Sequence, residues 1–167
     1  MFIPALEKGL DFLRRTQNAD GGWGYRQDND STTEPTAAAV LALPPSAERA
    51  RALDWLLRTQ RADGGWGLNA GDDASEGVGM WAVWALLIAG EEAAARRGLA
   101  WVAQMPVLRA NDPISSDLLG VNPALSGWGW TADSGSWVEP TALGVLTLSL
   151  GGETEHPRRA EGLALLR

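Results

Sequence analysis

The 167-residue chain contains no cysteine and a single histidine, His156. Without cysteine it forms no disulfide bond, no thiolate metal site and no cysteine nucleophile, and its cysteine usage leaves the cellular compartment open. Basic residues are also few, because 14 lysines and arginines face 21 aspartates and glutamates, which gives a net charge of −7. An acidic chain without a basic stripe is not expected to bind nucleic acid or an anionic membrane surface.

Long apolar runs are missing as well. The longest one, residues 77–90, is too short to cross a bilayer and predicts a buried helix instead. The first residues enter a charged segment without the basic and apolar regions of a signal peptide. We therefore expect a soluble, cytoplasmic protein without a transmembrane segment, whose length suits one domain.

What the chain does contain is a repeated motif. The sequence Thr-Gln-Asn-Ala-Asp-Gly-Gly-Trp-Gly of residues 16–24 returns at residues 59–67 with one substitution, and a weaker copy occupies residues 126–130. Trp23 and Trp66 are 43 residues apart, a period typical of helical-hairpin arrays and toroids. The glycine pair inside the motif predicts the end of a helix.

The glutamine of this motif has a predicted structural role. Gln17 and Gln60 fall in the last turn of the preceding helix, where their amide groups can bond the unpaired groups of the helix end. The following tryptophan ring is then expected to lie against them. We interpret the motif as a structural staple rather than a ligand site.

Two kinds of segment alternate along the chain. Residues 6–17, 49–60 and 91–104 place apolar side chains at helical spacing on one side and charges on the other, which predicts amphipathic helices. Residues 36–43, 78–89 and 141–150 contain no charged residue and predict helices buried on every side. Only an inner helix surrounded by other helices is apolar all round in a soluble protein, so the pattern predicts an all-α fold with an outer and an inner layer.

These segments divide the chain into repeats at residues 1–44, 45–90 and 91–152, with the start of a fourth at 153–167. The third repeat has Met105 and Pro106 where the others have Thr-Gln, and it carries a long insertion at residues 107–125. Such a loop is either a functional lid or a tolerated surface insertion. The last segment matches the opening of an outer helix and stops before the glutamine position, so we expect a longer chain or another subunit to supply the rest.

The Gln-x-x-x-Gly-x-Trp copies, each preceded by a leucine-rich helix, resemble the repeats of squalene-hopene cyclases, oxidosqualene cyclases and their prenyltransferase relatives. The resemblance implies a partial (α/α) toroid whose inner helices surround a cavity, and a complete toroid has about twice as many helices. Zinc-dependent protein prenyltransferases and the thioester proteins of the same fold need cysteine, so both classes are excluded.

The remaining relatives are class II terpene cyclases, in which an Asp-x-Asp-Asp-Thr-Ala signature opens an inner helix and its middle aspartate protonates an alkene or epoxide. Laid on this chain, the signature falls on residues 32–37, which makes Glu34 the proton donor. The flanking aspartates are replaced by Thr32 and Pro35. Because the same Glu-Pro-Thr-Ala sequence returns at residues 139–142, Glu34 can instead be a carboxylate that favours a helix start.

Four tryptophans are candidates for a cavity wall that offers π-faces to a cation or an apolar chain. They are Trp81, Trp84, Trp130 and Trp137. Packing in the core is the alternative role for tryptophan at helical spacing. The acidic pairs Asp28/Asp30 and Asp72/Asp73 are interpreted as turn formers, and we predict neither a metal nor a cofactor.

The leading functional hypothesis is an isoprenoid-handling, terpene-cyclase-like protein that binds a polyprenyl or triterpene-like chain on an apolar concave face. If the chain is active, acid-initiated cyclisation is assigned to Glu34. The alternative is a non-catalytic repeat module that acts as a scaffold or assembly element. Because a partial ring leaves apolar inner helices uncovered, we also expect self-association or a partner subunit that completes the ring.

Overall fold

The computed structural model describes residues 3–109, 122 and 125–167, and all regular secondary structure in these residues is helical apart from isolated bridges at Thr32. The helices are α1 (Ile3–Thr16), α2 (Thr33–Ala42), α3 (Ala47–Thr59), α4 (Gly79–Ala89), α5 (Glu92–Gln104), α7 (Val138–Leu150) and α8 (Pro157–Leu165). The all-α prediction is therefore confirmed for the described residues. No helix among them has the length and apolar character needed to cross a membrane.

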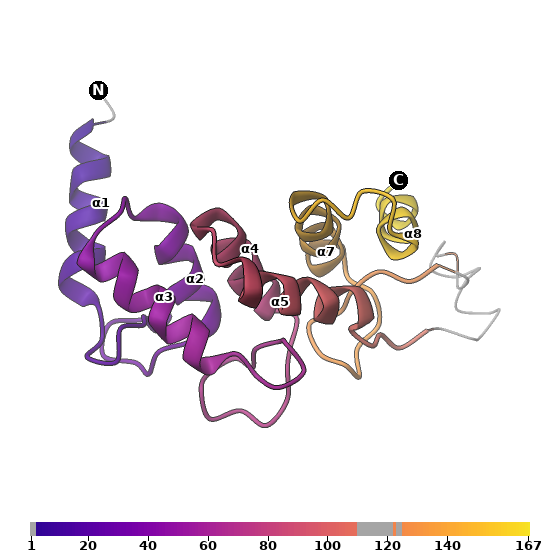
Figure 1. Cartoon of the computed structure of the whole chain (residues 1–167), viewed down its shortest axis with the longest axis horizontal. Coiled ribbons are helices and arrows are strands. Elements are labelled where there is room, and N and C mark those ends of the chain that lie inside the picture. Colours follow the sequence, from indigo (N-terminus) through magenta and orange to yellow (C-terminus); the bar gives the residue numbers. More distant parts are fainter. Residues whose placement is uncertain (1–2, 110–121, 123–124) are drawn as a thin grey trace.

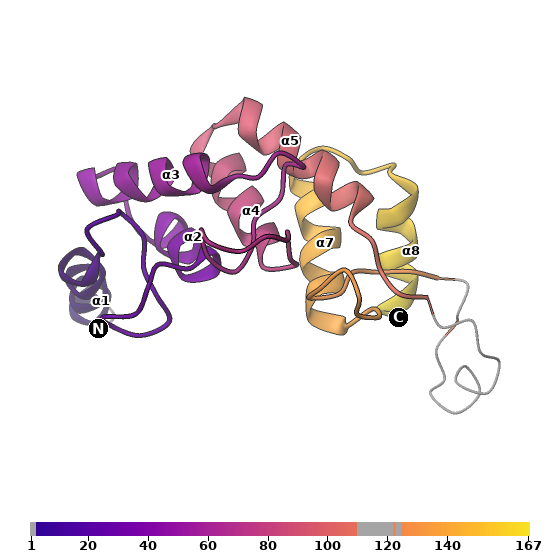
Figure 2. The same ribbon diagram turned by 90° about the horizontal axis from the view of Figure 1, so that it is seen from below.

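The helices form two rows (Figure 1). Helices α2, α4 and α7 pack side by side, whereas α3 packs on α2, α5 on α4 and α7, and α8 on α7. The α1 and α8 helices lie at opposite ends of the molecule, as Figure 2 also shows. The three segments without charge form the inner row, and the amphipathic segments 49–60 and 91–104 supply α3 and α5, which pack on it.

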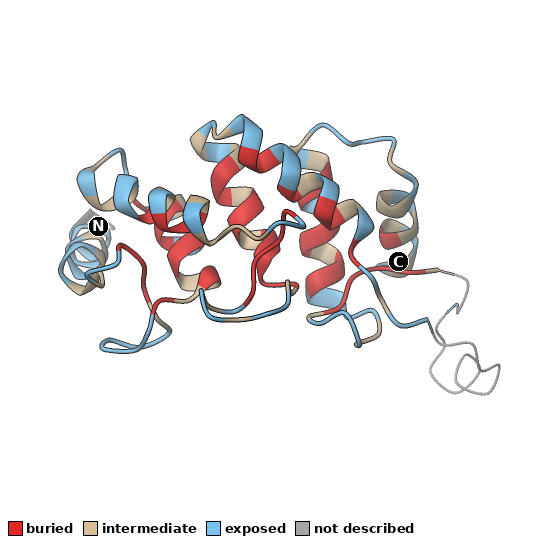
Figure 3. Ribbon diagram, turned by 60° about the horizontal axis from the view of Figure 1, so that its bottom comes forward, coloured by how far each residue is buried: buried red, intermediate tan, exposed pale blue. Residues whose placement is uncertain are grey.

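The prediction that the inner helices are buried on every side is wrong. The face of each inner helix that meets the outer row is buried, as at Val40 on α2, Leu86 on α4 and Leu148 on α7. The opposite face is open, because Ile88 is 57% exposed and Leu146 is 48% exposed. Figure 3 shows the buried residues gathered in the middle of the molecule, where the two rows of helices meet. The outer row covers one side of the inner row, and no other described element covers the second side.

The tryptophan of each motif copy closes the end of the preceding outer helix. Its indole Nε1 donates to a carbonyl in the last turn of that helix, at distances of 3.0, 2.8 and 2.8 Å for Trp23–Leu13, Trp66–Leu56 and Trp128–Val102. Carbonyl groups at a helix end lack a following helical turn to bond them, so a side-chain donor there stabilises the end. The tryptophan thus performs the helix-end role that the sequence analysis assigned to the glutamine.

The glutamine instead joins two repeats. Nε2 of Gln17 donates to the carbonyl oxygens of Gly21 in its own turn and Glu48 in the first turn of α3, both at 2.8 Å. Gln60 makes the same pair of bonds, to Gly64 and to Ala94 on α5, both at 2.9 Å. The staple interpretation therefore agrees with these contacts, but the staple acts between neighbouring repeats.

Asp20 holds the first motif turn through several hydrogen bonds at once. Its Oδ1 accepts from the Gly22 backbone at 3.0 Å and from Ser31 at 2.7 Å, and its Oδ2 accepts from the Trp55 indole at 2.9 Å. Burial opposes ionisation of Asp20, but these hydrogen bonds outweigh it, and the pKa of Asp20 is lowered.

We expect Asp20→Asn to lower the free energy of unfolding by about 1 kcal/mol at neutral pH, because an amide NH₂ cannot accept from Trp55. A lowered folded-state pKa stabilises the fold above the unfolded value of roughly 4, and this contribution is lost as pH falls through the folded value. The difference from wild type, measured by urea unfolding, should therefore shrink in acid. Asp63→Asn is the matched control, because Asp63 uses a single oxygen for Gly65 and Ser75, which an asparagine carbonyl replaces. Equal losses of unfolding free energy in Asp20→Asn and Asp63→Asn would contradict this explanation.

The predicted long loop at residues 107–125 falls largely outside the described residues, since 110–121 and 123–124 are not among them. Its beginning is not helical, and the Leu108 backbone N–H donates to the Ser134 carbonyl at 3.0 Å. The choice between a lid and a tolerated insertion therefore stays as predicted.

Candidate functional site

The open face of the inner row contains a groove of about 500 Å³, called here the inner groove. It is lined by side chains from all three inner helices: Leu41, Trp84, Ile88, Leu146, Ser149 and Leu150. Its volume lies within the range of roughly 300–1,000 Å³ typical of small-molecule sites. The inner groove is therefore the leading candidate for a binding site.

Helical spacing explains how these side chains meet. Trp84 and Ile88 are four residues apart on α4, and Leu146 and Leu150 have the same spacing on α7, so each pair shares one face of its helix. Trp84 is at the middle of α4, and the other lining residues come from the C-terminal halves of α2, α4 and α7. The inner helices therefore end together on the same side of the molecule, and the groove runs across their ends.

The one polar side chain in the groove already has partners within the protein. The Ser149 hydroxyl donates to the Val145 carbonyl at 2.7 Å and accepts from Arg159 Nε at 2.6 Å. Its hydrogen-bonding capacity is thus used inside the protein. The surface that the groove offers to a ligand is almost purely hydrocarbon and aromatic.

Two of the four predicted tryptophans belong to this region. Trp81 and Trp84 on α4 contact one another edge to face, with ring centroids 5.7 Å apart and an interplanar angle of 78°. Both rings are half-buried against the core, and neither buried indole N–H has a hydrogen-bond partner among the described residues. Trp84 lines the inner groove, and Trp81 supports it from one turn nearer the start of the helix.

The other two predicted tryptophans lie elsewhere. Trp130 is half-buried in the loop before α7, where its carbonyl accepts from the Gly77 backbone at 2.6 Å. Trp137 precedes α7 and is 61% exposed. Neither lines the inner groove.

Glu34 stands in the first turn of α2, half-buried, and its Oε2 accepts a hydrogen bond from the Tyr25 hydroxyl at 2.5 Å. Burial, together with this carboxylate, raises the pKa of Tyr25. Glu34 is seven residues before Leu41, which places both on the same side of α2 about 10 Å apart along its axis. The carboxylate therefore lies near one end of the helix face whose other end lines the groove.

No protein-family model matches this chain, and no curated protein does. Function is therefore inferred from the chain's own repeated motif and from the groove. The two are connected, because the motif turns fix where each inner helix begins.

A further carboxyl group, Glu76, stands in the second repeat at the place that Glu34 has in the first. It precedes α4, and its backbone N–H donates to the Trp66 carbonyl at 2.8 Å. Burial raises the pKa of Glu76, and the charge of Asp72 raises it further. Because Glu76 also precedes an inner helix, it joins Glu34 as a candidate acid.

The acidic pairs do not assemble a metal site among the described residues, where no group of three or more His, Asp or Glu side chains gathers. Asp72 instead closes a turn, because its carboxylate accepts from the backbone and the side chain of Asn69 at 3.0 and 3.1 Å. This contact fits the turn-forming interpretation of that pair.

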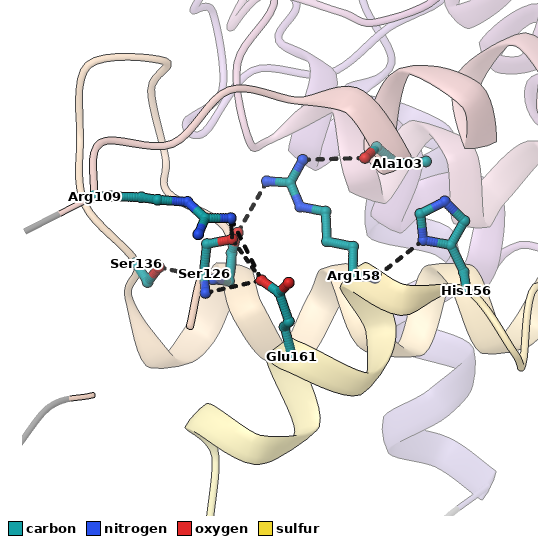
Figure 4. A network of polar contacts seen from close by, with 8 residues as sticks. Ala103, Arg109, Ser126, Ser136, His156, Arg158 and Glu161 are labelled. Carbon is teal, nitrogen blue, oxygen red and sulfur yellow. Dashed lines mark hydrogen bonds and ion pairs between the residues drawn. The ribbon is translucent and has the colours of Figure 1, made fainter. Parts of the chain in front are cut away.

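The third motif copy is joined to α8 by charged side chains that the sequence analysis did not single out (Figure 4). The Arg158 guanidinium donates to the carbonyl oxygens of Ala103 at 3.2 Å and Gly127 at 2.9 Å, and it lies 4.6 Å from the centre of the Trp128 ring. Burial lowers the pKa of Arg158 to about 10, although the charge of Glu161 opposes the shift. Arginine from the following helix thus bonds the turn that lacks the motif glutamine.

Glu161 completes this junction. Its Oε2 accepts from the backbone and the hydroxyl of Ser126, at 3.1 and 2.8 Å, and lies 3.6 Å from Arg109 (Figure 4). A neighbouring cavity of about 350 Å³ is lined by the same side chains together with His156. Because these polar groups form hydrogen bonds with one another and with the backbone, we interpret the cluster as a structural junction that connects α5, the third motif turn and α8.

Proposed function

We propose that the chain is a partial (α/α) toroid of the terpene-cyclase kind and that its inner groove binds the apolar chain of an isoprenoid. The observation that carries the proposal is the hydrocarbon and aromatic surface of the groove across three inner helices. The resemblance of the motif copies to cyclase repeats supports an isoprenoid over other apolar ligands. Trp84 adds a π-face, which suits both an alkene chain and a developing carbocation.

The binding experiment uses geranylgeraniol as the probe and follows the Trp84 indole N–H signal by NMR. Binding should shift this signal, and Ile88→Asp or Leu146→Asp should weaken binding by about tenfold, because a charge would then have to lose water against an apolar chain. Both positions are about half exposed, so neither variant should destabilise the fold. Val138→Asp is the matched control, since Val138 is 77% exposed on α7 but outside the groove.

Two outcomes would oppose the proposal. Unchanged binding in the two groove variants would place the ligand elsewhere. Absence of any shift, combined with an oligomer that the same variants convert to a monomer in sedimentation experiments, would favour the scaffold alternative. In that case the groove would be an association surface.

Acid chemistry is tested separately. Incubation with squalene and shorter polyprenyl substrates should yield cyclised products if the chain is catalytic. We expect Glu34→Gln to abolish turnover while leaving geranylgeraniol binding unchanged, because the glutamine keeps the shape of the side chain and removes its acid. Turnover equal to wild type in Glu34→Gln but lost in Glu76→Gln would move the role to Glu76.

A further inference from the structure

Each complete motif turn is covered by the next outer helix along the chain. The first turn (residues 17–24) packs on α3 and the second turn (residues 60–67) packs on α5, as the glutamine bonds to Glu48 and Ala94 show. In return, Arg51 of α3 donates to the Gln17 side chain, and Arg97 of α5 donates to Gln60. The two junctions are therefore built in the same way.

The receiving helices share further features at this junction. Trp55 of α3 and Trp101 of α5 are 1% and 7% exposed beneath the turns. One turn earlier each helix has a small residue, Ala52 or Gly98, and a Cβ added to Gly98 would lie only 3.3 Å from the Trp66 ring. A cation, a small residue and an aromatic ring on one face thus define a receiving surface for a motif turn.

The α1 helix carries the same surface. Its sequence Lys-Gly-Leu-Asp-Phe-Leu aligns with Arg-Ala-Leu-Asp-Trp-Leu of α3, and both helices continue into Arg-Thr-Gln after one further residue. Lys8, Gly9 and Phe12 therefore correspond to Arg51, Ala52 and Trp55. Arg15 corresponds to Arg58, which donates to the Asp20 carbonyl in the first junction.

On α1, no described residue covers this surface. Lys8, Gly9, Phe12 and Arg15 are all exposed, and Phe12 is 50% exposed where Trp55 is 1% exposed. A Cβ added to Gly9 would meet no atom within 4 Å. Figures 1 and 2 show α1 at the free end of the molecule.

We propose that this face of α1 is a docking surface for a Gln-x-x-Asp-Gly-Gly-Trp turn presented by another polypeptide. Lys8 and Arg15 would meet the glutamine amide oxygen and the aspartate backbone carbonyl of the incoming turn, as Arg51 and Arg58 meet those of Gln17 and Asp20. The charges are also complementary, because the turn carries a carboxylate, and the charge of Arg58 helps to lower the pKa of Asp20 in the first junction. The open space at Gly9 would receive the tryptophan ring. This inference does not depend on ligand binding in the inner groove.

A second folded copy of this chain does not present such a turn. Its first and second turns are held by α3 and α5, and the third copy, at residues 126–130, is held by α8 through Arg158 and Glu161. This excludes a second copy, and the occupant that we propose is a different polypeptide whose last motif turn has no following helix to cover it.

The test uses the full ¹⁵N-labelled chain and a synthetic peptide with the sequence of residues 56–69, which contains the second turn. We expect the peptide to shift the backbone signals of Lys8, Gly9 and Phe12. Peptides with Asp63→Ala or Trp66→Ala should lose these shifts, because they lack the carboxylate or the ring that the surface receives.

Two chain variants provide the controls. Gly9→Leu fills the space for the tryptophan ring and should abolish the shifts, whereas Gly9→Ala should retain them, because alanine occupies the same position in α3. Both replace glycine by a better helix former, so neither should lower the melting temperature. The proposal would be overturned if the peptide shifted no signal of the wild-type chain or shifted only signals of α5. It would also be overturned if Gly9→Leu bound the peptide as well as the wild type does.

Discussion

Replacing Trp66 by alanine is expected to lower the free energy of unfolding by about 3–5 kcal/mol, the range for removing a large aromatic side chain from a core. The ring is fully buried, and it packs between the end of α3 and Gly98 of α5. The substitution also leaves the Leu56 carbonyl without the indole N–H that lies 2.8 Å away. Loss of the ring therefore loosens two helices and removes the cap of one of them.

Thermal unfolding monitored by circular dichroism measures this effect. At roughly 2–4 °C per kcal/mol for a chain of this size, the melting temperature should fall by about 6–20 °C. Trp66→Phe tests the hydrogen bond, since an aromatic ring remains while the indole N–H is lost. Loss of the hydrogen bond should lower the free energy of unfolding by about 1 kcal/mol, in addition to the effect of the smaller ring on packing. Trp137→Ala, at a 61% exposed position, should change stability by less than about 0.5 kcal/mol. A Trp66→Ala loss as small as that of Trp137→Ala would refute the structural role of the motif.

The helices were predictable from the sequence because their signals are local. Charge on one side of the helix marks α3 and α5, and the absence of charge marks most of α4 and α7. A glycine pair follows the ends of α1 and α3. The same periodicity does not tell an apolar residue that faces a neighbouring helix from one that faces solvent. Leu86 and Ile88 lie in the same uncharged helix, yet one is fully buried and the other is 57% exposed.

The candidate site was predictable only in part for the same reason. Trp84 was singled out as an aromatic residue on an inner helix, and it does line the groove. Leu41 and Leu146 were not singled out, because nothing in the local sequence distinguishes them from the other aliphatic residues of the inner row. Their role depends on where α2 and α7 lie relative to α4, which is set by contacts between repeats.

The Arg158 junction was missed for a related reason. Arg158 bonds Ala103, which is 55 residues earlier, and no local spacing links the two. The missing glutamine in the third motif copy was a usable signal, since another side chain then has to join the turn to the following helix, as Arg158 does at the Gly127 carbonyl. The sequence therefore indicated that this junction differs from the first two without indicating which residue replaces the glutamine.

Gly21→Ala is expected to lower the free energy of unfolding by the second largest amount, after Trp66→Ala. Gly21 has a φ of +93°, and a Cβ added there would lie 2.6 Å from the Arg51 carbonyl oxygen of α3. The left-handed backbone costs about 1 kcal/mol with a side chain, and overpacking against a rigid backbone adds about 1–3 kcal/mol. We therefore expect urea unfolding to show a loss of roughly 3 kcal/mol.

The matched control separates these two contributions. Gly152 has a φ of +84°, and no atom lies within 4 Å of a Cβ added there, so Gly152→Ala should show the backbone cost alone, about 1 kcal/mol. The excess loss in Gly21→Ala then measures how closely the first turn approaches α3. Because Gln17 and Arg51 meet at the same junction, this excess should shrink when Gly21→Ala is combined with Gln17→Ala, which already loosens the contact. Equal losses for Gly21→Ala and Gly152→Ala would mean that the turn can move away from α3 at no cost, and the rigid junction from which the docking surface of α1 is inferred would be wrong.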